Sequence, residues 1–387
     1  MIKRRDFKKR IILKIMIIIE KYLNNKYTFQ YNVLTNRTFI KAKKDKDFKL
    51  LDGYKINSIK RELNNNKYPC SQSDIKSLLE SDYVPKFNPF VDYFEKLPKW
   101  NRKTDYIQQL IDTVKTTNQE DFAWAFKKWL VAMVACAIED DITNQAILIF
   151  TGGQGIGKTT WMGKLVPDTL KDYFFSGTIQ PNNKDNNLLL SERLLINLDE
   201  LASFNKKQIE LFKEMITKGI VSERRAYGHY TENYIRRASF VGSSNHNEIL
   251  MDVTGNRRFL CFEAKTIELD HTLNMDLVYS QVMHILKEEN FKYFFDLEDI
   301  ARLEENNKMF KQSCEEEEWI EDLFDIVSNS DANILYYSAS EIIEYIKKKK
   351  NFYQKISPID IGKIMTSKGF ERKKIKGSWK YIVRLKQ

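Results

Sequence analysis

The sequence predicts an α/β protein organised around an open sheet, with a helical region before the sheet and a small basic unit after it. Three observations predict this arrangement. An apolar run ending at Phe150 is short enough for a buried strand and leads directly into a glycine cluster. Residues 188–265 then alternate strand-like and helix-like patterns, which is typical of an open α/β sheet. Beyond residue 318, two helical patterns precede two short strands.

Length and composition set the broad class of the protein. At 387 residues the chain is long enough for two or three domains, and a hydrophobic fraction of 42% is enough to build real cores, which argues against global disorder. The net charge of +10 indicates a polyanionic partner such as nucleic acid, although solvated lysine-rich faces give the same total. We divide the chain into four parts. Residues 1–85 form a small basic α/β region of unassigned function, 86–140 a helical lead-in, 141–315 an open-sheet α/β core and 318–387 a C-terminal unit.

The cysteines and the N-terminal segment indicate the cellular compartment of the protein. Cys70, Cys136, Cys261 and Cys314 lie far apart without a C-x-x-C pair, which argues against a zinc site or a disulfide framework and is compatible with a reducing cytosol. The Ile-rich run near the N-terminus is interrupted by a lysine and has no small-residue cleavage site, so it predicts a basic amphipathic helix rather than an export signal. No stretch approaches the ~20 apolar residues of a membrane span. We therefore expect a cytoplasmic protein with no membrane partner.

Local patterns before residue 140 predict helices and one hairpin. An aromatic stripe along the last of these helices, formed by Phe122, Trp124, Phe126 and Trp129, favours a buried core over a base-stacking platform. Prolines at 85, 89 and 98 mark a boundary segment. The expected helices span about 8–23, 74–79, 104–115 and 119–139, and the hairpin strands span 27–32 and 37–43.

The glycine cluster has the spacing of a P-loop at every fixed position, Gly152-x-x-x-x-Gly157-Lys158-Thr159. Glycines let backbone N–H groups turn inward around phosphate oxygens, the following helix presents its positive end, and Lys158 reaches the β and γ phosphates. The Thr159 hydroxyl is then a candidate Mg²⁺ ligand. A strand-to-helix turn with incidental glycines is the alternative. The residues expected to hold ATP are Gly152, Gly153, Gln154, Gly155, Ile156, Gly157, Lys158, Thr159 and Thr160.

A second apolar strand, Leu194–Leu198, ends in two acids. An ATPase needs one carboxylate for the Mg²⁺ shell and a base to orient the attacking water, and Asp199 and Glu200 suit these two roles. Many surface strands end in acids, so this motif alone is weak; downstream of a P-loop it becomes strong. The adjacent glutamate indicates an ATPase of the additional-strand (ASCE) class.

Two further motifs complete the predicted site. Asn245 follows a third strand and can hold the γ-phosphate or the attacking water, although in isolation it reads as a turn residue. Arg257 and Arg258 follow a glycine turn, from which an arginine can project toward the nucleotide of a neighbouring subunit and stabilise transition-state charge. Paired surface arginines are the simpler alternative.

The order of these motifs resembles the virulence-associated protein E (VirE/VapE) family, which is related to the superfamily 3 replication helicases within AAA+. The likeness runs from about Asn88 to Phe262, and the block 254–259, Thr-Gly-Asn-Arg-Arg-Phe, is its most specific part. The resemblance implies an AAA+-like core and a ring, commonly a hexamer, that acts on DNA in the replication modules of phages and mobile elements. Many members carry a primase upstream. The segment before Asn88 is too short for a full primase domain, so a separate primase is the candidate partner.

The resemblance also implies a pore hairpin between the acidic strand and Asn245. In superfamily 3 helicases the corresponding stretch grips one DNA strand, with basic residues on phosphates and aromatic residues on bases. A lone exposed histidine is otherwise often incidental. The candidates in this sequence are Arg224, Arg225, Tyr227, His229 and Tyr230.

The C-terminal unit predicts a winged-helix-like domain. The pattern predicts helices over 340–350 and 359–368, the second of which stops at Gly369, and strands over 370–376 and 378–385 on either side of a turn at Gly377. A basic cluster on a helix and wing is typical of DNA binding, whereas a solvated lysine surface on a protein-binding wing is the alternative. The candidate DNA contacts are Lys368, Arg372, Lys373, Lys374 and Lys376.

Taken together, the motifs predict an ATP-driven helicase or translocase acting on single-stranded or forked DNA as a homo-oligomeric ring. A DNA-binding initiator or regulator that uses ATP as an assembly switch shares the same site and stays open. An ATPase that acts on protein substrates is a third possibility, although it leaves the basic C-terminal face without a purpose.

Overall fold

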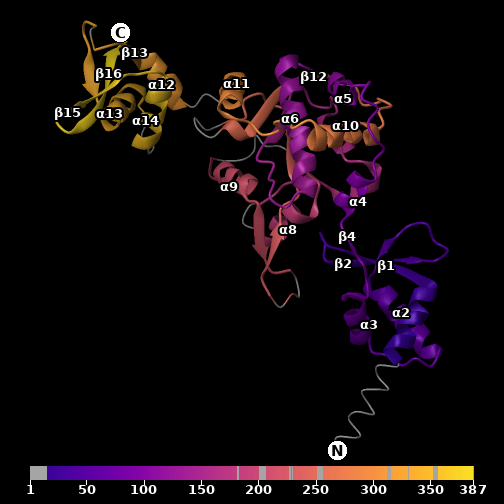
Figure 1. Ribbon diagram of the computed structural model, residues 1–387. Coiled ribbons are helices and arrows are strands. Elements are labelled where there is room, and N and C mark those ends of the chain that lie inside the picture. The colour runs from indigo at the N-terminus through magenta and orange to yellow at the C-terminus, as the bar shows by residue number, and fades with distance from the viewer. Residues whose placement is uncertain are drawn as a thin grey trace, which may run out of the picture.

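The chain forms a small N-terminal unit, a large α/β unit and a small C-terminal unit, which follow one another along the sequence (Figure 1). The computed structural model describes residues 15–180, 183–199, 206–225, 228, 230–250, 256–311, 315–329, 331–351 and 356–386.

The N-terminal unit is a small sheet covered by helices. The predicted hairpin is confirmed: β1 pairs antiparallel with β2, from Tyr27 opposite Ala42 to Asn32 opposite Arg37. The predicted first helix is described over 15–26, and α2 has no counterpart among our expectations. The sheet order is β3-β2-β1-β4. The elements are β1 Tyr27–Asn32, β2 Arg37–Ala42, β3 Lys49–Leu50, α2 Gly53–Asn65, α3 Gln72–Leu79 and β4 Lys86–Phe87.

The central unit is organised around a sheet of order β5-β12-β6-β11-β8-β7. Strands β12, β6, β11, β8 and β7 run parallel, and β5 pairs antiparallel with β12 at one edge. Strand β11 therefore lies between β6, which precedes the glycine loop, and β8, which precedes Asp199. The strands are β5 Val114–Thr116, β6 Ile147–Thr151, β7 Phe174–Gly177, β8 Leu195–Leu198, β11 Ser239–Ser243 and β12 Phe259–Ile267, and a separate hairpin pairs β9 Ile220–Glu223 with β10 Glu232–Ile235.

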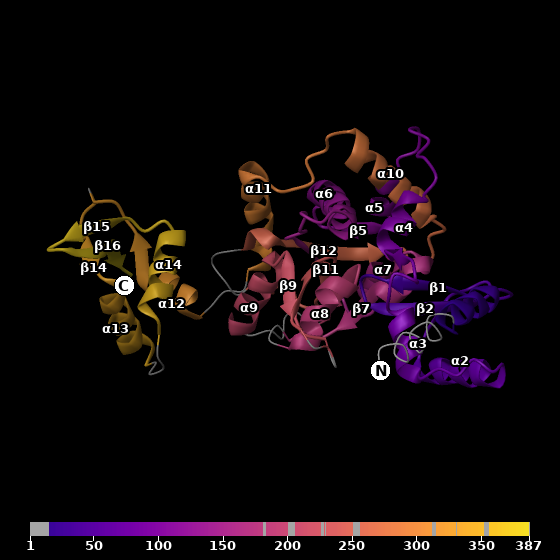
Figure 2. The same cartoon turned by 60° about the horizontal axis from the view of Figure 1, so that its bottom comes forward.

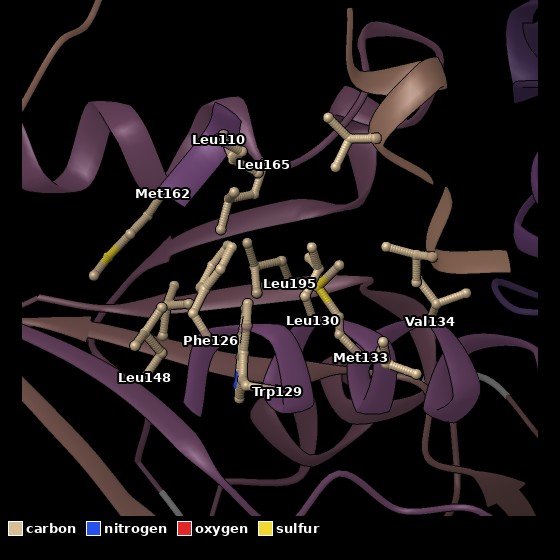
Figure 3. Packing of buried hydrophobic residues seen from close by; sticks show 14 of the residues in the cluster. Leu110, Phe126, Trp129, Leu130, Met133, Val134, Leu148, Met162, Leu165 and Leu195 are labelled. Atoms are coloured by element: carbon tan, nitrogen blue, oxygen red, sulfur yellow. The ribbon is translucent and has the colours of Figure 1, made fainter. Parts of the chain in front are cut away.

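Helices cover both faces of this sheet, with α6 on one side and α8 and α9 on the other (Figure 2). Leu148 and Phe150 of β6 pack into one core with α6, and Ile147 and Ile149 pack into a second core on the opposite face, as strand alternation requires. The predicted aromatic core of α6 is confirmed for Phe122, Phe126 and Trp129, whereas Trp124 is half-buried. Figure 3 shows side chains of this helix against Leu148 and Leu195. The helices are α4 Pro89–Glu95, α5 Tyr106–Asp112, α6 Gln119–Ile138, α7 Lys158–Lys164, α8 Lys184–Glu192, α9 Lys206–Thr217, α10 Met275–Glu288 and α11 Leu297–Asn307, with short 3-10 turns η1 Asp168–Tyr173, η3 Asn256–Arg258 and η4 Lys308–Phe310.

The helix expected over 104–115 is only partly correct. α5 ends at Asp112, and Val114–Thr116 form β5 instead, paired with Ala264–Ile267 of β12. The side chain of Val114 is fully buried, and β-branched Val114 and Thr116 flank the exposed Lys115, a pattern that fits an edge strand. α4, α5 and α6 share one hydrophobic core with the sheet, so this region is packed as part of the central unit.

The C-terminal unit contains the two helices and two strands predicted from its sequence, preceded by α12, β13 and β14, which were not predicted. Helices α13 and α14 and strands β15 and β16 agree with the expected elements to within two residues at each end. The helix stop at Gly369 has φ +87°, and the β15–β16 turn uses Lys376 and Gly377 with φ +48° and +84°. The elements are α12 Glu315–Leu323, β13 Phe324–Ile326, β14 Leu335–Tyr337, α13 Ala339–Lys350, α14 Pro358–Ser367, β15 Arg372–Ile375 and β16 Ser378–Leu385. Among the described helices of the whole chain, none has the length and apolarity needed to cross a bilayer.

A buried arginine fixes the start of β11. Arg236 is completely buried and donates hydrogen bonds to the carbonyls of Ile216, Asn144 and Ala238, the last two at 2.7 and 2.9 Å. Its guanidinium lies 5.1 Å from the ring centroid of Phe240. Burial lowers the pKa of Arg236 to about 10, which leaves it protonated at neutral pH. One side chain thus connects the end of α9, the segment before β6 and the start of β11.

We expect Arg236→Met to destabilise the central unit by about 3 kcal/mol, because three buried carbonyls lose a charged donor while the side-chain volume is kept. The measurement is the urea midpoint of the transition that reports on the central unit. Lys287→Ala, at an exposed position of α10, should stay within about 0.5 kcal/mol of the parent protein. Equal midpoints for the two variants would contradict this role for Arg236.

Candidate nucleotide-binding site

Three strand ends meet at one edge of the central sheet. The glycine loop follows β6, Asp199 follows β8, and Asn245 follows β11. Phe150 is paired with Ser243, and Gly242 is paired with Leu198, so the three strands end side by side. In open α/β sheets, ligands bind at the carboxyl ends of the strands. The register therefore brings together residues that are far apart in the sequence.

The loop between β6 and α7 has a backbone that only glycine adopts readily. Gly152, Gly155 and Gly157 have φ values of +129°, +80° and +93°. A Cβ on Gly152 would lie 2.5 Å from the carbonyl oxygen of Ala264 in β12, so the loop packs directly against the neighbouring strand. Four residues of the loop lie between Gly152 and Gly157, namely Gly153, Gln154, Gly155 and Ile156. Of these, Gly153, Gln154 and Gly155 are exposed.

The ammonium group of Lys158, the first residue of α7, lies inside this loop. Lys158 is 6% exposed and donates hydrogen bonds to the carbonyls of Gly152 and Gly153, both at 2.8 Å, and to Oδ1 of Asn245 at 3.2 Å. All three acceptors are neutral, and burial lowers the pKa of Lys158. A buried ammonium group held only by neutral oxygens favours an anion beside it.

Thr159 faces Asp199. Its hydroxyl lies 3.3 Å from Oδ1 of Asp199 and 3.4 Å from the Ser243 hydroxyl. Thr160, the next residue of α7, is exposed and lines a different cavity, of about 510 Å³, along that helix. The structure thus brings together the predicted residues Lys158, Thr159, Asp199 and Asn245, whereas Glu200 lies outside the described residues.

Two further residues hold Asp199 and were not predicted. Ser176 of β7 donates to Oδ2 of Asp199 at 2.8 Å, and Asn197 of β8 donates to Oδ1 at 2.6 Å. Asn197 also donates to the Ser176 hydroxyl at 2.9 Å. A polar Asn197 within the apolar strand Leu194–Leu198 was the sequence signal for this network. Hydrogen bonds from two neighbouring strands fix the orientation of the carboxylate.

The two predicted arginines lie at the opposite end of the parallel strands, where the strands begin. They precede β12, whose first residue, Phe259, is paired with Ile147 at the amino end of β6. Five strand residues separate this end from the glycine loop, about 16 Å at the usual rise. Arg257 and Arg258 line a cavity of about 350 Å³ together with Thr143, Asn144 and three aromatic residues, Tyr293, Phe294 and Phe295.

The Arg258 side chain is only partly satisfied in this cavity. Its buried Nε has no hydrogen-bond partner in the described part of the chain. Burial and the neighbouring Arg257 lower the pKa of Arg258. The arginines therefore do not meet Lys158 within one copy of the chain.

The predicted pore residues have different surroundings. Arg225 forms a salt bridge with Glu192, donates to the carbonyl of Leu34 at 2.9 Å and lies 4.8 Å from the ring centroid of Tyr234. It is 20% exposed, and its contacts connect the β9–β10 hairpin to α8 and to the N-terminal unit. Arg224 and Tyr230 are exposed, whereas Tyr227 and His229 lie outside the described residues.

The residues of the predicted C-terminal basic cluster also fall into two groups, one paired with carboxylates and one exposed. Lys368 forms salt bridges with Glu321 and with Glu317, so carboxylates of α12 neutralise it. Arg372, Lys373, Lys374 and Lys376 are all exposed on β15 and its turn. The positive charge of the unit therefore lies on the β15–β16 hairpin and, in addition, on the four lysines in the last turn of α13.

Comparison with known proteins places the chain in a family. Residues 94–315, more than half of the chain, match the virulence-associated protein E-like domain. The chain belongs to this family, as its sequence motifs indicated.

Comparison with solved structures finds remote likenesses. Two solved apo structures of the NrS-1 C-terminal region each cover 95% of this chain and 98% of their own, at 12% identity and TM-scores of 0.46 and 0.47. A third covers 99% of its own chain at 13% identity and a TM-score of 0.48. No curated protein matches the chain.

We expect Gly152→Ala to destabilise the central unit by about 2 kcal/mol more than Gly155→Ala. Both substitutions put a side chain on a left-handed backbone, at a cost of about 1 kcal/mol. Only at Gly152 does the new Cβ also meet a backbone oxygen that cannot move without displacing β12. Denaturant midpoints of the two variants measure the difference, and equal values would show that the loop is not packed against β12.

Proposed function

We propose that this chain is a P-loop ATPase of the AAA+ type that acts on DNA. The observation that carries the proposal is the convergence of Lys158, Thr159, Asp199 and Asn245 at one edge of the sheet. The strand order supports the same assignment, because β11 lies between the glycine-loop strand and the Asp199 strand. A strand inserted at that position defines the additional-strand class.

The residues of this edge fit ATP and Mg²⁺. The glycine loop gives backbone N–H groups access to phosphate oxygens, and Lys158 supplies a positive charge that has only neutral acceptors. Thr159 and Asp199 offer a hydroxyl and a carboxylate oxygen 3.3 Å apart, and hard oxygen ligands are what Mg²⁺ prefers. Bound there, the ion would neutralise charge on the β and γ phosphates.

Each side chain then has a role in ATP hydrolysis. Lys158 holds the γ-phosphate, and Asn245, whose amide oxygen lies 3.2 Å from the Lys158 ammonium, orients either that phosphate or the attacking water. Ser176 and Asn197 keep Asp199 in position. Glu200 is the candidate base on sequence grounds.

We expect Lys158→Ala to weaken ATP binding about 100-fold, because it removes charge-assisted hydrogen bonds to phosphate oxygens. Asp199→Asn should leave metal-free ATP binding within a few-fold of the parent and abolish the gain in affinity from Mg²⁺. Calorimetric titration with and without Mg²⁺ measures both effects, with Lys287→Ala as a matched lysine control. ATP affinity that is indifferent to Lys158 would remove the proposed site.

The position of the arginines supports a shared site between subunits. Arg257 and Arg258 lie at the sheet edge opposite the glycine loop, and the Nε of Arg258 lacks an acceptor among the described residues. In a head-to-tail ring, commonly a hexamer in this family, the arginine edge of one subunit faces the nucleotide of the next. Arg258 would then stabilise transition-state charge in the neighbouring site.

DNA is the proposed partner of this ring. The family, the exposed Arg224 and Tyr230 and the basic β15–β16 hairpin support a helicase or translocase of a phage or mobile-element replication module, with a separate primase as a candidate partner. The C-terminal unit would act as a winged-helix-like DNA-binding domain. Strand separation on a labelled fork distinguishes this function from an ATP-switched initiator, which would bind the fork without opening it.

Mixing Lys158→Ala with Arg258→Ala protein should restore DNA-stimulated ATP turnover, although each variant alone is inactive. In a random equal mixture about a quarter of the head-to-tail interfaces are intact. Mixing Lys158→Ala with Asp199→Asn is the control, because both changes affect the same side of the interface and no intact site results. Turnover in the first mixture no higher than in the control would exclude an arginine acting across subunits.

A further inference from the structure

The β15–β16 hairpin carries an exposed tryptophan, Trp379. Trp379 is 54% exposed, and it is the second residue of β16. Single exposed apolar side chains are common on protein surfaces, so exposure alone indicates nothing. The residues around Trp379 are what indicate a function for it.

Strand pairing defines which residues share its face. Lys374 is opposite Trp379, and Arg372 is opposite Tyr381, so these four residues lie on one face of the hairpin. Tyr381 is buried, and its hydroxyl donates to the carbonyl of Gly362 in α14 at 2.9 Å. This face is therefore the one turned toward α14, and Trp379 lies on it one step closer to the hairpin turn.

The ring of Trp379 is held by a cation. The Arg372 guanidinium lies 4.8 Å from the ring centroid, a cation–π distance. An aromatic ring in contact with an arginine loses little further freedom when it binds a flat ligand, because its orientation is already restricted.

The surrounding charge is positive and largely uncompensated. In the described part of the chain, Lys373, Lys374 and Lys376 form no salt bridge, whereas Lys368 and Lys380 are paired with Glu321 and Glu341. Lys368, at the end of α14, and Lys380, opposite Lys373 on β16, are thus neutralised, whereas the three lysines of β15 and its turn have no carboxylate partner among the described residues. Such a surface is complementary to a phosphate backbone.

We propose that Trp379 is a base-stacking residue through which the hairpin binds single-stranded nucleic acid. One base stacks on the indole ring, and Arg372 and Lys374 contact the flanking phosphates. The ligand is a single strand rather than a duplex, because neighbouring bases cover both faces of a base pair inside a helix. An aromatic platform bordered by cations is how proteins bind single strands without reading their sequence. The inference rests on the proposed DNA-binding function and adds to it the position and strandedness of the contact.

The test compares a normal oligonucleotide with one of equal length whose bases are absent, using the full chain and fluorescence anisotropy. The parent protein should bind the normal strand about tenfold more tightly than the abasic one. Trp379→Ala should lose this tenfold preference, leave abasic binding unchanged and leave the slope of log affinity against log salt unchanged. Trp379→Phe, which keeps an aromatic ring, should retain most of the preference.

Lys374→Ala, the cross-strand neighbour, is the matched control. It should weaken both ligands equally and lower the salt slope by about 0.7, the value for one phosphate contact on a single strand. If Trp379→Ala weakens both oligonucleotides equally, or neither, the stacking role is wrong while DNA binding stands. If the parent protein binds neither oligonucleotide, the proposed function and this inference both fail.

Discussion

The parallel pairing of β11 between β6 and β8 is the constraint on which the site depends. It aligns Phe150 with Ser243 and Gly242 with Leu198, and so sets Lys158, Asp199 and Asn245 beside one another. A shift of one residue in this register would turn Asn197 and the apolar strand residues to the wrong faces. Arg236 and Asn144 act against such a shift, because they bind the segments at the start of β6 and β11.

Much of the fold could be predicted because it is encoded locally. The β1–β2 hairpin and the C-terminal helices follow from alternation, helix caps and turn glycines, which act over a few residues. The fixed spacing from Gly152 to Thr159 and the acids after β8 likewise predicted which strand ends would meet. β5 could not be predicted in this way, because Val114 and Thr116 form a strand only when β12 offers a partner.

The roles of individual cations were the least predictable part. A lysine or arginine reads the same in a sequence whether it faces solvent or a carboxylate elsewhere in the chain. Arg225 and Lys368 were expected to contact DNA, yet Glu192 and Glu321 neutralise them. Ser176, which holds Asp199, had no signal at all, because a serine at a strand end is common. The net charge of +10 therefore says little about where a polyanion would bind until internal pairs are subtracted.

The contact between Arg225 and the carbonyl of Leu34 has a mechanical consequence. Together with the hydrogen bond from Asn32 to Tyr173, it fastens the tip of the N-terminal sheet to the central unit at two points. One of these two hydrogen bonds comes from Arg225, which lies in the β9–β10 hairpin. A movement of that hairpin must either move the N-terminal sheet with it or break the hydrogen bond from Arg225 to the Leu34 carbonyl. The positions of the hairpin and the N-terminal sheet are therefore coupled.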